Sequence, residues 1–219
     1  MTPAVAGMRG PEIPGFRWVR PLGQGGFADV FLYRQELPSR EVAIKVVRTQ
    51  GDERGTKELH READAMTLLA GHPAVVELHG VGTTADGRAY LVMEYCPVAD
   101  LLTQVRARPM DLEKALDTMI KVCGGVEMFH RQGYVHRDIK PSNIMLDAYG
   151  KPVLADFGVA SKVGQLEVGA FDGFSVLWAP PEQQDVNSWA SPLQDVWALA
   201  ATTWTFVTGR SPFEDPIGD

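Results

Sequence analysis

Cysteine, long apolar runs and basic charge are all scarce in this sequence, and each scarcity excludes a class of protein. Cys96 and Cys123 are the only cysteines among 219 residues, which is too few for a disulfide framework or a cysteine zinc cluster. No run of about 20 apolar residues occurs, so we expect no membrane span in this segment. The formal net charge of −7 argues against a nucleic-acid partner. Few cysteines also suit a reducing compartment, and we expect a cytoplasmic location.

The remaining composition is that of a globular protein with a substantial core. Hydrophobic residues make up 45% of the chain and charged residues 22%, and this length suits one large domain or two small lobes. The carboxylates gather in the last third, where residues 141–219 hold three Lys or Arg and ten Asp or Glu. Such a surplus could bind cations, attract basic partners or keep the protein soluble.

The first half of the chain has the pattern of a β-rich lobe. Residues 1–15 are rich in proline and glycine, and we expect them to form a flexible lead-in. Short alternating or β-branched runs across residues 16–96 predict five strands with one inserted helix. The expected strands are residues 16–20, 28–33, 41–47, 75–81 and 89–95, and the expected helix is residues 56–70.

The second half, residues 97–219, has a helical pattern. A long helix is expected to begin near Asp111. Ser191 as N-cap and Pro192 at the first helical position predict a last helix that runs toward Gly209. The fold class is therefore α+β with two lobes, and ligand sites favour the cleft between such halves. The apolar face of the long helix is expected to consist of Leu112, Leu116, Met119, Ile120, Cys123, Val126 and Phe129.

Two features of the first lobe could bind a phosphate, and each also has an ordinary explanation. The glycine cluster at residues 23–26 joins two expected strands, where glycine lets backbone N–H groups approach an anion, although many hairpins have glycine turns. No helix follows this cluster, which excludes the dinucleotide-binding fingerprint and the Walker-type phosphate loop. Lys45 lies in an apolar strand; it could hold a phosphate with Glu62 as its partner, or be an edge-strand lysine that faces water.

Three motifs in the second lobe are much more specific. Residues 134–143 read Y-V-H-R-D-I-K-P-S-N, residues 156–158 read D-F-G, and residues 179–182 read A-P-P-E. With the glycine cluster and the V-A-I-K of residues 42–45, in this order, they resemble the protein kinase family from about residue 16 onward. The motif spelling is similar to the eukaryotic-type Ser/Thr kinases of bacteria, which are often tethered to a membrane through a later segment.

The resemblance implies a role for each polar residue of these motifs. Asp138 would accept or orient the proton of the attacking hydroxyl group. Lys140 would balance charge on the transferring phosphoryl group, and a lysine at this position is the Ser/Thr-kinase pattern. Asn143 and Asp156 would supply oxygen ligands for Mg²⁺ or Mn²⁺.

The resemblance also implies an ATP site. Lys45 would hold the α- and β-phosphates while an ion pair to Glu62 fixes the lysine. Met93 would be the gatekeeper, and backbone groups of Glu94 and Cys96 would bind the adenine edge. The residues expected to bind ATP are Leu22, Gly23, Gln24, Gly25, Gly26, Val30, Ala43, Lys45, Met93, Glu94, Cys96 and Met145.

Other positions keep or change the family pattern. Ala28 replaces the third glycine of the loop, and we expect altered loop mobility rather than lost binding. Ser175, in the segment expected to contact the substrate, takes the place of the family Ser or Thr that contacts Asp138 and Lys140 and helps to set the Ser/Thr preference. Glu182 and Asp195 take structural places, the latter as a brace for the catalytic loop.

The segment between Gly158 and Ser175 contains one residue that can be phosphorylated, Ser161. The family arginine at position 137 normally binds a phosphorylated loop residue. Our hypothesis is that the carboxylate of Glu167 or Asp172 takes this role, so that the kinase is active without loop phosphorylation. The alternative is that both are solvated loop residues.

The helical lobe ends earlier than in the family, so we expect a shortened C-terminus and either a missing piece or a homodimer through the exposed face. The resemblance implies an ATP- and Mg²⁺-dependent protein kinase that transfers the γ-phosphoryl group to Ser or Thr hydroxyls of protein substrates. The alternative function is a pseudokinase or nucleotide-binding scaffold with little or no transfer. Lys45, Asp138 and Asp156 are all present, and such proteins usually lack one of them.

Overall fold

The computed structural model describes residues 8–98, 100–168, 176–185 and 187–214, and the chain divides into two compact units. The division falls after Cys96, but Gly71–Val75 groups with the second unit. The reason is local pairing, because the backbone N–H of Leu154 donates to the carbonyl of Ala74 at 2.8 Å and Val75 forms a parallel bridge with Leu154.

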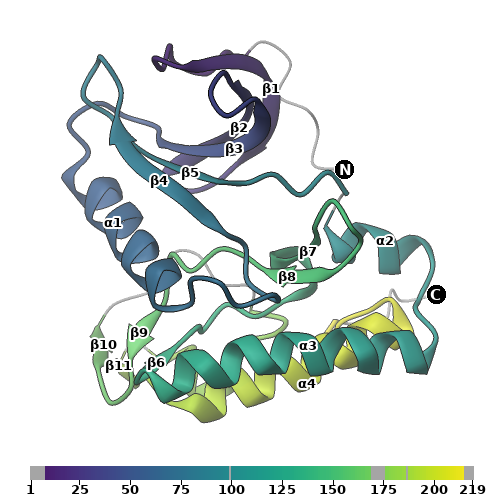
Figure 1. The fold of residues 1–219 in the computed structure, drawn as a ribbon. Coiled ribbons are helices and arrows are strands. Elements are labelled where there is room, and N and C mark those ends of the chain that lie inside the picture. Colours follow the sequence, from purple (N-terminus) through teal and green to yellow (C-terminus); the bar gives the residue numbers. More distant parts are fainter. Residues whose placement is uncertain (1–7, 99, 169–175, 186, 215–219) are drawn as a thin grey trace. The chain divides into compact units, whose positions relative to one another are not determined.

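The first unit is an antiparallel sheet with the strand order β1-β2-β3-β5-β4 and one helix, α1 (Figure 1). The five strands and the helix that the sequence predicts are all present, with shifted ends. Asp52 caps α1, since its carboxylate accepts a hydrogen bond from the backbone N–H of Gly55 at 2.9 Å. The elements are β1 (Phe16–Gln24), β2 (Ala28–Gln35), β3 (Arg40–Val47), α1 (Glu53–Leu68), β4 (Leu78–Thr83) and β5 (Ala89–Glu94).

The two faces of this sheet pack differently, because successive side chains of a strand point to opposite faces. On one face, Val47 and Leu91 pack against Leu59 and Ala63 of α1. The other face carries the main apolar cluster of the unit, which is made of Ile13, Phe31, Tyr33, Val42, Ile44, Val46 and Val92.

Residues 8–15, which we expected to belong to a flexible lead-in, contact this apolar cluster. Ile13 is only 3% exposed, and the Tyr33 hydroxyl donates a hydrogen bond to the carbonyl of Pro11 at 2.6 Å. A Cβ atom at Gly10 would overlap the Tyr33 hydroxyl and the Trp18 ring, so glycine permits the close approach. This part of the lead-in is therefore packed against the sheet.

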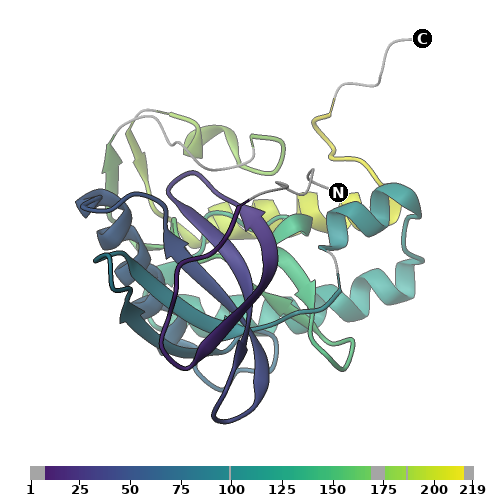
Figure 2. The same ribbon diagram turned by 90° about the horizontal axis from the view of Figure 1, so that it is seen from above.

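Among its described residues, the second unit contains three α-helices, two short 3-10 helices (η1 and η2) and three two-stranded sheets. Helices α3 and α4 lie side by side (Figure 1), and the β10–β11 pair is visible in Figure 2. The elements are α2 (Leu101–Ala107), α3 (Leu112–Arg131), β6 (Tyr134–Val135), η1 (Pro141–Asn143), β7 (Ile144–Leu146), β8 (Pro152–Leu154), β9 (Ser161–Lys162), β10 (Leu166–Val168), η2 (Pro181–Gln183), β11 (Asn187–Trp189) and α4 (Pro192–Thr208). The sheets pair β6 with β9, β7 with β8 and β10 with β11.

The apolar face predicted for α3 is wrong in part. Leu112, Leu116, Ile120 and Cys123 are exposed, so Cys123 is not a core residue. Small side chains on the buried face let other segments of the same chain approach α3 closely. A Cβ atom on Gly125, for example, would lie 3.2 Å from the Val75 side chain. The buried face consists of Ala115, Thr118, Met119, Val122, Gly125, Val126 and Phe129.

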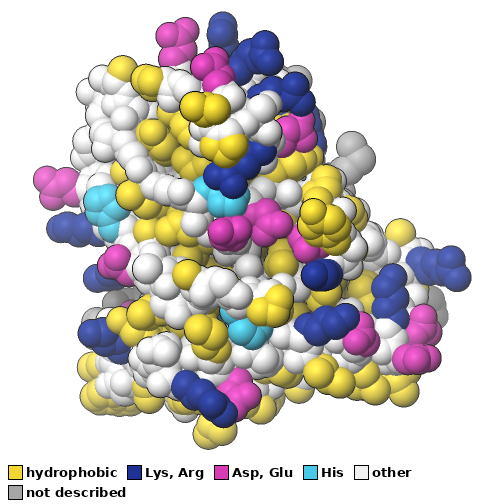
Figure 3. Space-filling model, viewed as in Figure 1, with side chains coloured by type: hydrophobic (Ala, Val, Ile, Leu, Met, Phe, Trp, Pro, Cys, Tyr) yellow, Lys and Arg dark blue, Asp and Glu magenta, His cyan; other side chains and the backbone are white. Residues whose placement is uncertain are grey.

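The start predicted for the last helix is confirmed. Ser191 caps α4 in a capping box with Gln194, Pro192 is its first residue, and Gly209 ends it in the left-handed conformation at φ 78°. Large apolar side chains of α4, Trp204 among them, remain exposed, and hydrophobic side chains line the lower edge of Figure 3, where α4 runs in Figure 1.

Within the described residues, no helix is both long and apolar enough to cross a membrane.

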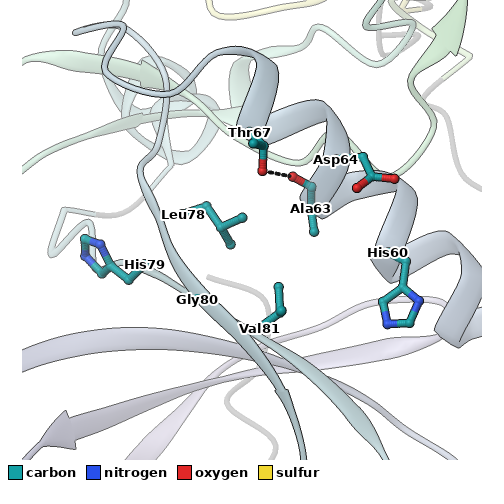
Figure 4. A pocket seen from close by; sticks show the side chains of 8 residues that line it. All are labelled: His60, Ala63, Asp64, Thr67, Leu78, His79, Gly80 and Val81. Carbon is teal, nitrogen blue, oxygen red and sulfur yellow. Dashed lines mark hydrogen bonds between the residues drawn. The ribbon is translucent and has the colours of Figure 1, made fainter.

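A shallow pocket of about 350 Å³ lies between α1 and β4 in the first unit. His60 of α1 and His79 of β4 lie at opposite ends of it (Figure 4), so they do not converge on one point. Across the described part of the chain, no group of three or more His, Cys, Asp or Glu is arranged to hold a metal ion. The pocket is lined by His60, Ala63, Asp64, Thr67, Leu78, His79, Gly80 and Val81.

Candidate active site

Lys45 is held by a carboxylate in the interior of the first unit. Strand β3 lies between β2 and β5, so Lys45 is not on a sheet edge. Its Nζ atom lies 2.9 and 2.7 Å from the two carboxylate oxygens of Glu62 on α1. The side chains are 12% and 1% exposed, so the charges are largely removed from water and require each other. The explanation as an edge lysine facing water is therefore excluded.

The sheet register places four of the predicted ATP-binding residues on the face that carries Lys45. Directly opposed residues of antiparallel strands share a face, as do residues two apart on one strand. Lys45 pairs with Val30 on β2, while Ala43 pairs with Met93 on β5. Val30, Ala43, Lys45 and Met93 thus form one continuous surface of the first unit.

The remaining predicted ATP-binding residues lie at strand ends or on β7. Gly25 closes the turn between β1 and β2 by donating its N–H to the carbonyl of Ala28 at 2.8 Å, and a Cβ atom there would lie 3.0 Å from that oxygen. Any larger residue at Gly25 would therefore crowd this carbonyl. Leu22, Gly23 and Gln24 end β1, Gly26 lies in the turn, Glu94 and Cys96 lie at and after the end of β5, and Met145 lies on β7 of the second unit.

Asp138 is the centre of a charged cluster in the second unit. Its two carboxylate oxygens lie 2.9 and 2.7 Å from Nζ of Lys140. The side-chain amide of Asn143, in the short η1 helix, donates to the Asp138 carboxylate and to its backbone carbonyl, both at 2.9 Å. Asp138 is 7% exposed. A lysine and an amide thus orient one nearly buried carboxylate.

The loop that carries Asp138 is fixed by the carboxylate of Asp195, one turn into α4. Asp195 is fully buried and accepts hydrogen bonds from the backbone N–H groups of His136 at 2.8 Å and Arg137 at 2.7 Å. His130 of α3 lies 2.7 Å away through Nε2. A buried carboxylate needs such donors, so α4 determines the backbone conformation of the residues before Asp138.

Strained backbone is found at two positions of the predicted site. Arg137, at φ 68°, and Asp156, at φ 62°, are the only non-glycine residues with positive φ in the described part of the chain. L-residues rarely adopt this conformation, and it persists where surrounding structure imposes it. Both residues adjoin the predicted chemistry, since Arg137 precedes Asp138 and Asp156 is a predicted metal ligand.

Burial changes the ionisation of the catalytic loop. Desolvation raises the pKa of Asp138 to about 6, while the charge and hydrogen bond of Lys140 act in the opposite direction. Burial lowers the pKa of the completely buried His136, which is therefore neutral. His136 accepts a hydrogen bond at Nδ1 from the backbone N–H of Asp138 at 3.2 Å, which places its own proton on Nε2.

Asn143 and Asp156 lie at the same end of the β7–β8 hairpin. Asn143 precedes β7, and the backbone N–H of Ala155, next to Asp156, donates to the carbonyl of Asn143 at 2.8 Å. The Asn143 amide uses its nitrogen to bind Asp138, which leaves its side-chain oxygen as a ligand. Asp156 is exposed. An amide and a carboxylate oxygen are ligands that Mg²⁺ accepts, so the donor set fits this ion.

Glu167 is the carboxylate that meets Arg137. Its Oε1 atom lies 3.7 Å from Nη1 of Arg137, and Ser161 connects the two by donating to Glu167 at 2.7 Å and accepting from Arg137 at 3.1 Å. Of the two acids that the sequence singles out, Glu167 therefore lies beside the arginine. Asp172 and Ser175 lie outside the described residues.

Some functional contacts were missed by sequence reasoning. Gln183, next to Glu182, is buried and donates to the backbone carbonyl of Arg137 at 2.6 Å. Glu182 itself is exposed, without an ion pair to any described residue. His130 of α3, which belongs to none of the motifs, contacts Asp195. No sequence signal marks Gln183, because a glutamine beside a motif has no characteristic spacing.

The five-stranded sheet with one helix, followed by a helical unit that fixes a catalytic-type aspartate, is the organisation of a protein kinase domain. Residues 16–219 match the family described as Protein kinase domain. The chain belongs to this family, as its motifs predict.

Proteins similar to this chain include Ser/Thr kinases of bacteria. The chain is 37% identical to the serine/threonine-protein kinase PknK of Mycobacterium bovis and to that of Mycobacterium tuberculosis, over 95% of this chain and 20% of each relative. It is 32% identical to the serine/threonine-protein kinase PrkC of Bacillus subtilis, over 94% of this chain and 32% of the relative. The chain thus spans about a fifth to a third of the length of these relatives.

Proposed function

We propose that this protein transfers the γ-phosphoryl group of ATP to Ser or Thr hydroxyls of protein substrates and requires Mg²⁺. The observation that carries the proposal is the Asp138 cluster, in which Lys140 and Asn143 orient a carboxylate on a loop fixed by Asp195. Positioning and charge neutralisation are what phosphoryl transfer needs from a protein.

Asp138 is the group that we assign to the attacking hydroxyl. The hydroxyl oxygen of the substrate forms a bond to the γ-phosphorus while the bond from that phosphorus to the β–γ bridging oxygen breaks. ADP leaves, and the hydroxyl proton passes to Asp138. Lys140, 2.7 Å from the Asp138 carboxylate, offsets negative charge on the transferring group.

The ATP phosphates are assigned to Lys45, which Glu62 holds in one position, and to the glycine turn. Mg²⁺, held by Asn143 and Asp156, would supply charge neutralisation at the phosphate oxygens. The adenine is assigned to Val30 and Ala43, with Met93 as gatekeeper and with the backbone at Glu94 and Cys96 on its edge. Leu22 and Met145 complete the assignment.

The preference for Ser or Thr is supported by Lys140 and by the names of the relatives. Lys45, Asp138 and Asp156 are all present, so no observation favours a pseudokinase. A protein substrate, a homodimer through the shortened C-lobe, Ser175 as a substrate contact, a cytoplasmic location and a longer membrane-anchored protein remain predictions.

The experiment is transfer of labelled phosphate from ATP to a generic basic protein, with the wild-type chain and Asp138→Asn. Loss of the carboxylate should lower the rate about 100- to 10,000-fold, the range typical of a positioned acid or base. The matched control is Asp185→Asn, because Asp185 is an exposed carboxylate of the same unit. Equal incorporation by wild type and Asp138→Asn would contradict the role of Asp138. ATP binding without any transfer by the wild type would favour the pseudokinase instead.

A further inference from the structure

Arg48, directly after β3, hydrogen-bonds to three consecutive carbonyls of the glycine turn. Its guanidinium donates to the carbonyl of Gly25 through Nη2 and to that of Gly26 through Nη1, the latter at 3.3 Å. Its backbone N–H donates to the carbonyl of Phe27 at 2.9 Å. One residue therefore determines where the carbonyl oxygens of the whole turn point.

Asp29 holds the guanidinium of Arg48 in this position. Its Oδ1 atom accepts from Nη2 of Arg48 at 2.9 Å and from Nε at 3.3 Å. The Asp29 side chain is 8% exposed and that of Arg48 is 40% exposed, so a nearly buried carboxylate anchors an arginine at the surface. A planar guanidinium bound through two nitrogens keeps its orientation better than a lysine ammonium would.

The register places this contact on the sheet face opposite Lys45. Asp29 pairs with Val46, and Arg48 follows Val46 by two residues, so Asp29, Val46 and Arg48 share one face. Lys45 pairs with Val30 on the other face. Arg48 therefore approaches the glycine turn from the side that does not carry the Lys45–Glu62 pair.

The carbonyls of the turn determine the direction of its N–H groups. In a trans peptide the C=O and N–H bonds point in opposite directions. Because the carbonyls of Gly25 and Gly26 face Arg48, the N–H groups of Gly26 and Phe27 face the opposite side, which is the side of Lys45. Neither N–H donates to an acceptor among the described residues. Successive N–H groups that point together form a concave site for an anion.

We propose that Arg48, anchored by Asp29, is a positioning residue for phosphate binding. It holds the glycine turn so that the N–H groups of Gly26 and Phe27 are directed toward the phosphates of the nucleotide, without touching the nucleotide itself. This inference rests on the proposed function, since it concerns the phosphate subsite of the same ATP site.

The test compares ATP with adenosine, which lacks the phosphates. Titrations of the full chain should show that Arg48→Met weakens ATP binding about tenfold while adenosine binding changes by less than about twofold, because only the phosphate donors lose their orientation. In transfer assays, the KM for ATP should rise by a similar factor, with little change in kcat. The matched control is Arg34→Met, because the side chain of Arg34 is exposed on β2 and makes no hydrogen bond to the described residues.

Two further variants separate positioning from general stability. Arg48→Lys keeps the charge but has no planar fork, so it should bind ATP with intermediate affinity. Asp29→Asn should also weaken ATP binding, but by less than Arg48→Met does. Unchanged ATP affinity in Arg48→Met, or an equal loss for ATP and adenosine, would overturn the inference. If the wild-type chain bound neither ligand, the proposed function would fail first, so the two failures are distinguishable.

Discussion

The two units hold their functional residues by different means. In the first, a contact between two side chains fixes Lys45, because Glu62 reaches it from a different element. In the second, backbone N–H groups of His136 and Arg137 bind the buried carboxylate of Asp195. The first arrangement fixes the end of one side chain, and the second fixes the main chain that leads to Asp138, the proposed catalytic residue.

This difference indicates what each unit must do. A residue that binds a ligand phosphate can be placed by a side-chain pair while its strand is held by ladder hydrogen bonds. A catalytic loop has no such ladder, and its left-handed residue at Arg137 needs external donors and acceptors to persist. Asp195 accepts a hydrogen bond from the backbone N–H of Arg137, and Gln183 donates one to the backbone carbonyl of the same residue.

The largest effect is expected from Asp195→Asn. The amide has the shape of the carboxylate, but its NH₂ group would face a backbone N–H donor in a site without water access. We expect the free energy of unfolding to fall by about 3 kcal/mol and the transfer rate to fall with it. Urea unfolding of the wild type and the variant, together with kcat, measures both changes.

Asp185→Asn is again the control, since it makes the same chemical change at an exposed position of the same unit. A loss of stability in both variants alike would mean that burial of Asp195 is not the cause. Full transfer activity in Asp195→Asn would show that the loop conformation does not depend on α4, and the contrast between the units would then be wrong.

A smaller effect on stability is expected in the first unit, from Lys45→Met and Glu62→Gln. Each removes the ion pair, and both should lower kcat/KM at least tenfold. The double variant should be less destabilised than the sum of the single variants, with a coupling free energy of about 1–2 kcal/mol. Denaturant unfolding of the four proteins gives the coupling, and transfer assays give the activity. Additive effects would show that the pair does not contribute as a unit.

Much of the fold could be predicted because its signals are local. Alternation in strands and the capping sequence at Ser191 depend on residues near one another in the chain, and both appear as expected. The motifs also marked Lys45 and Asp138, and they marked Glu62 and Lys140, which contact these residues in the structure. This was possible because a resemblance to a family indicates a whole set of site residues at once.

The failures concern contacts between distant segments. The buried face of α3 is lined by small residues such as Ala115 and Gly125, because neighbouring chain approaches it closely, and periodicity of large apolar residues does not record this. In the sequence, Arg48 is a charged residue that follows an expected strand and belongs to none of the motifs. Its proposed role in phosphate binding depends on contacts with Asp29 and the glycine turn, which lie about twenty residues earlier in the chain.

The smallest effect is expected from Glu167→Gln. This variant tests whether the Glu167 carboxylate supports the loop that carries Arg137 and Asp138 when the protein is not phosphorylated. The glutamine keeps the hydrogen bond from Ser161 but loses the charge beside Arg137. We expect kcat of phosphate-free protein to fall by about two- to tenfold, the range of one partly exposed charge interaction. The KM for ATP should not change. Glu113→Gln, an exposed acid on α3, is the matched control.

The activity of phosphate-free wild-type protein decides how the result for Glu167→Gln is interpreted. Because Glu167 already lies beside Arg137, protein treated with phosphatase and checked by mass should keep its transfer activity. The buried Ser161 hydroxyl bridges Arg137 and Glu167, so a phosphate there would bring two negative charges to the Glu167 carboxylate and displace it. If phosphate-free protein were inactive and phosphate at Ser161 or Ser175 restored activity, Glu167 would not substitute for a phosphorylated residue. The active conformation of the loop that carries Asp138 would then depend on phosphorylation as well as on its backbone hydrogen bonds.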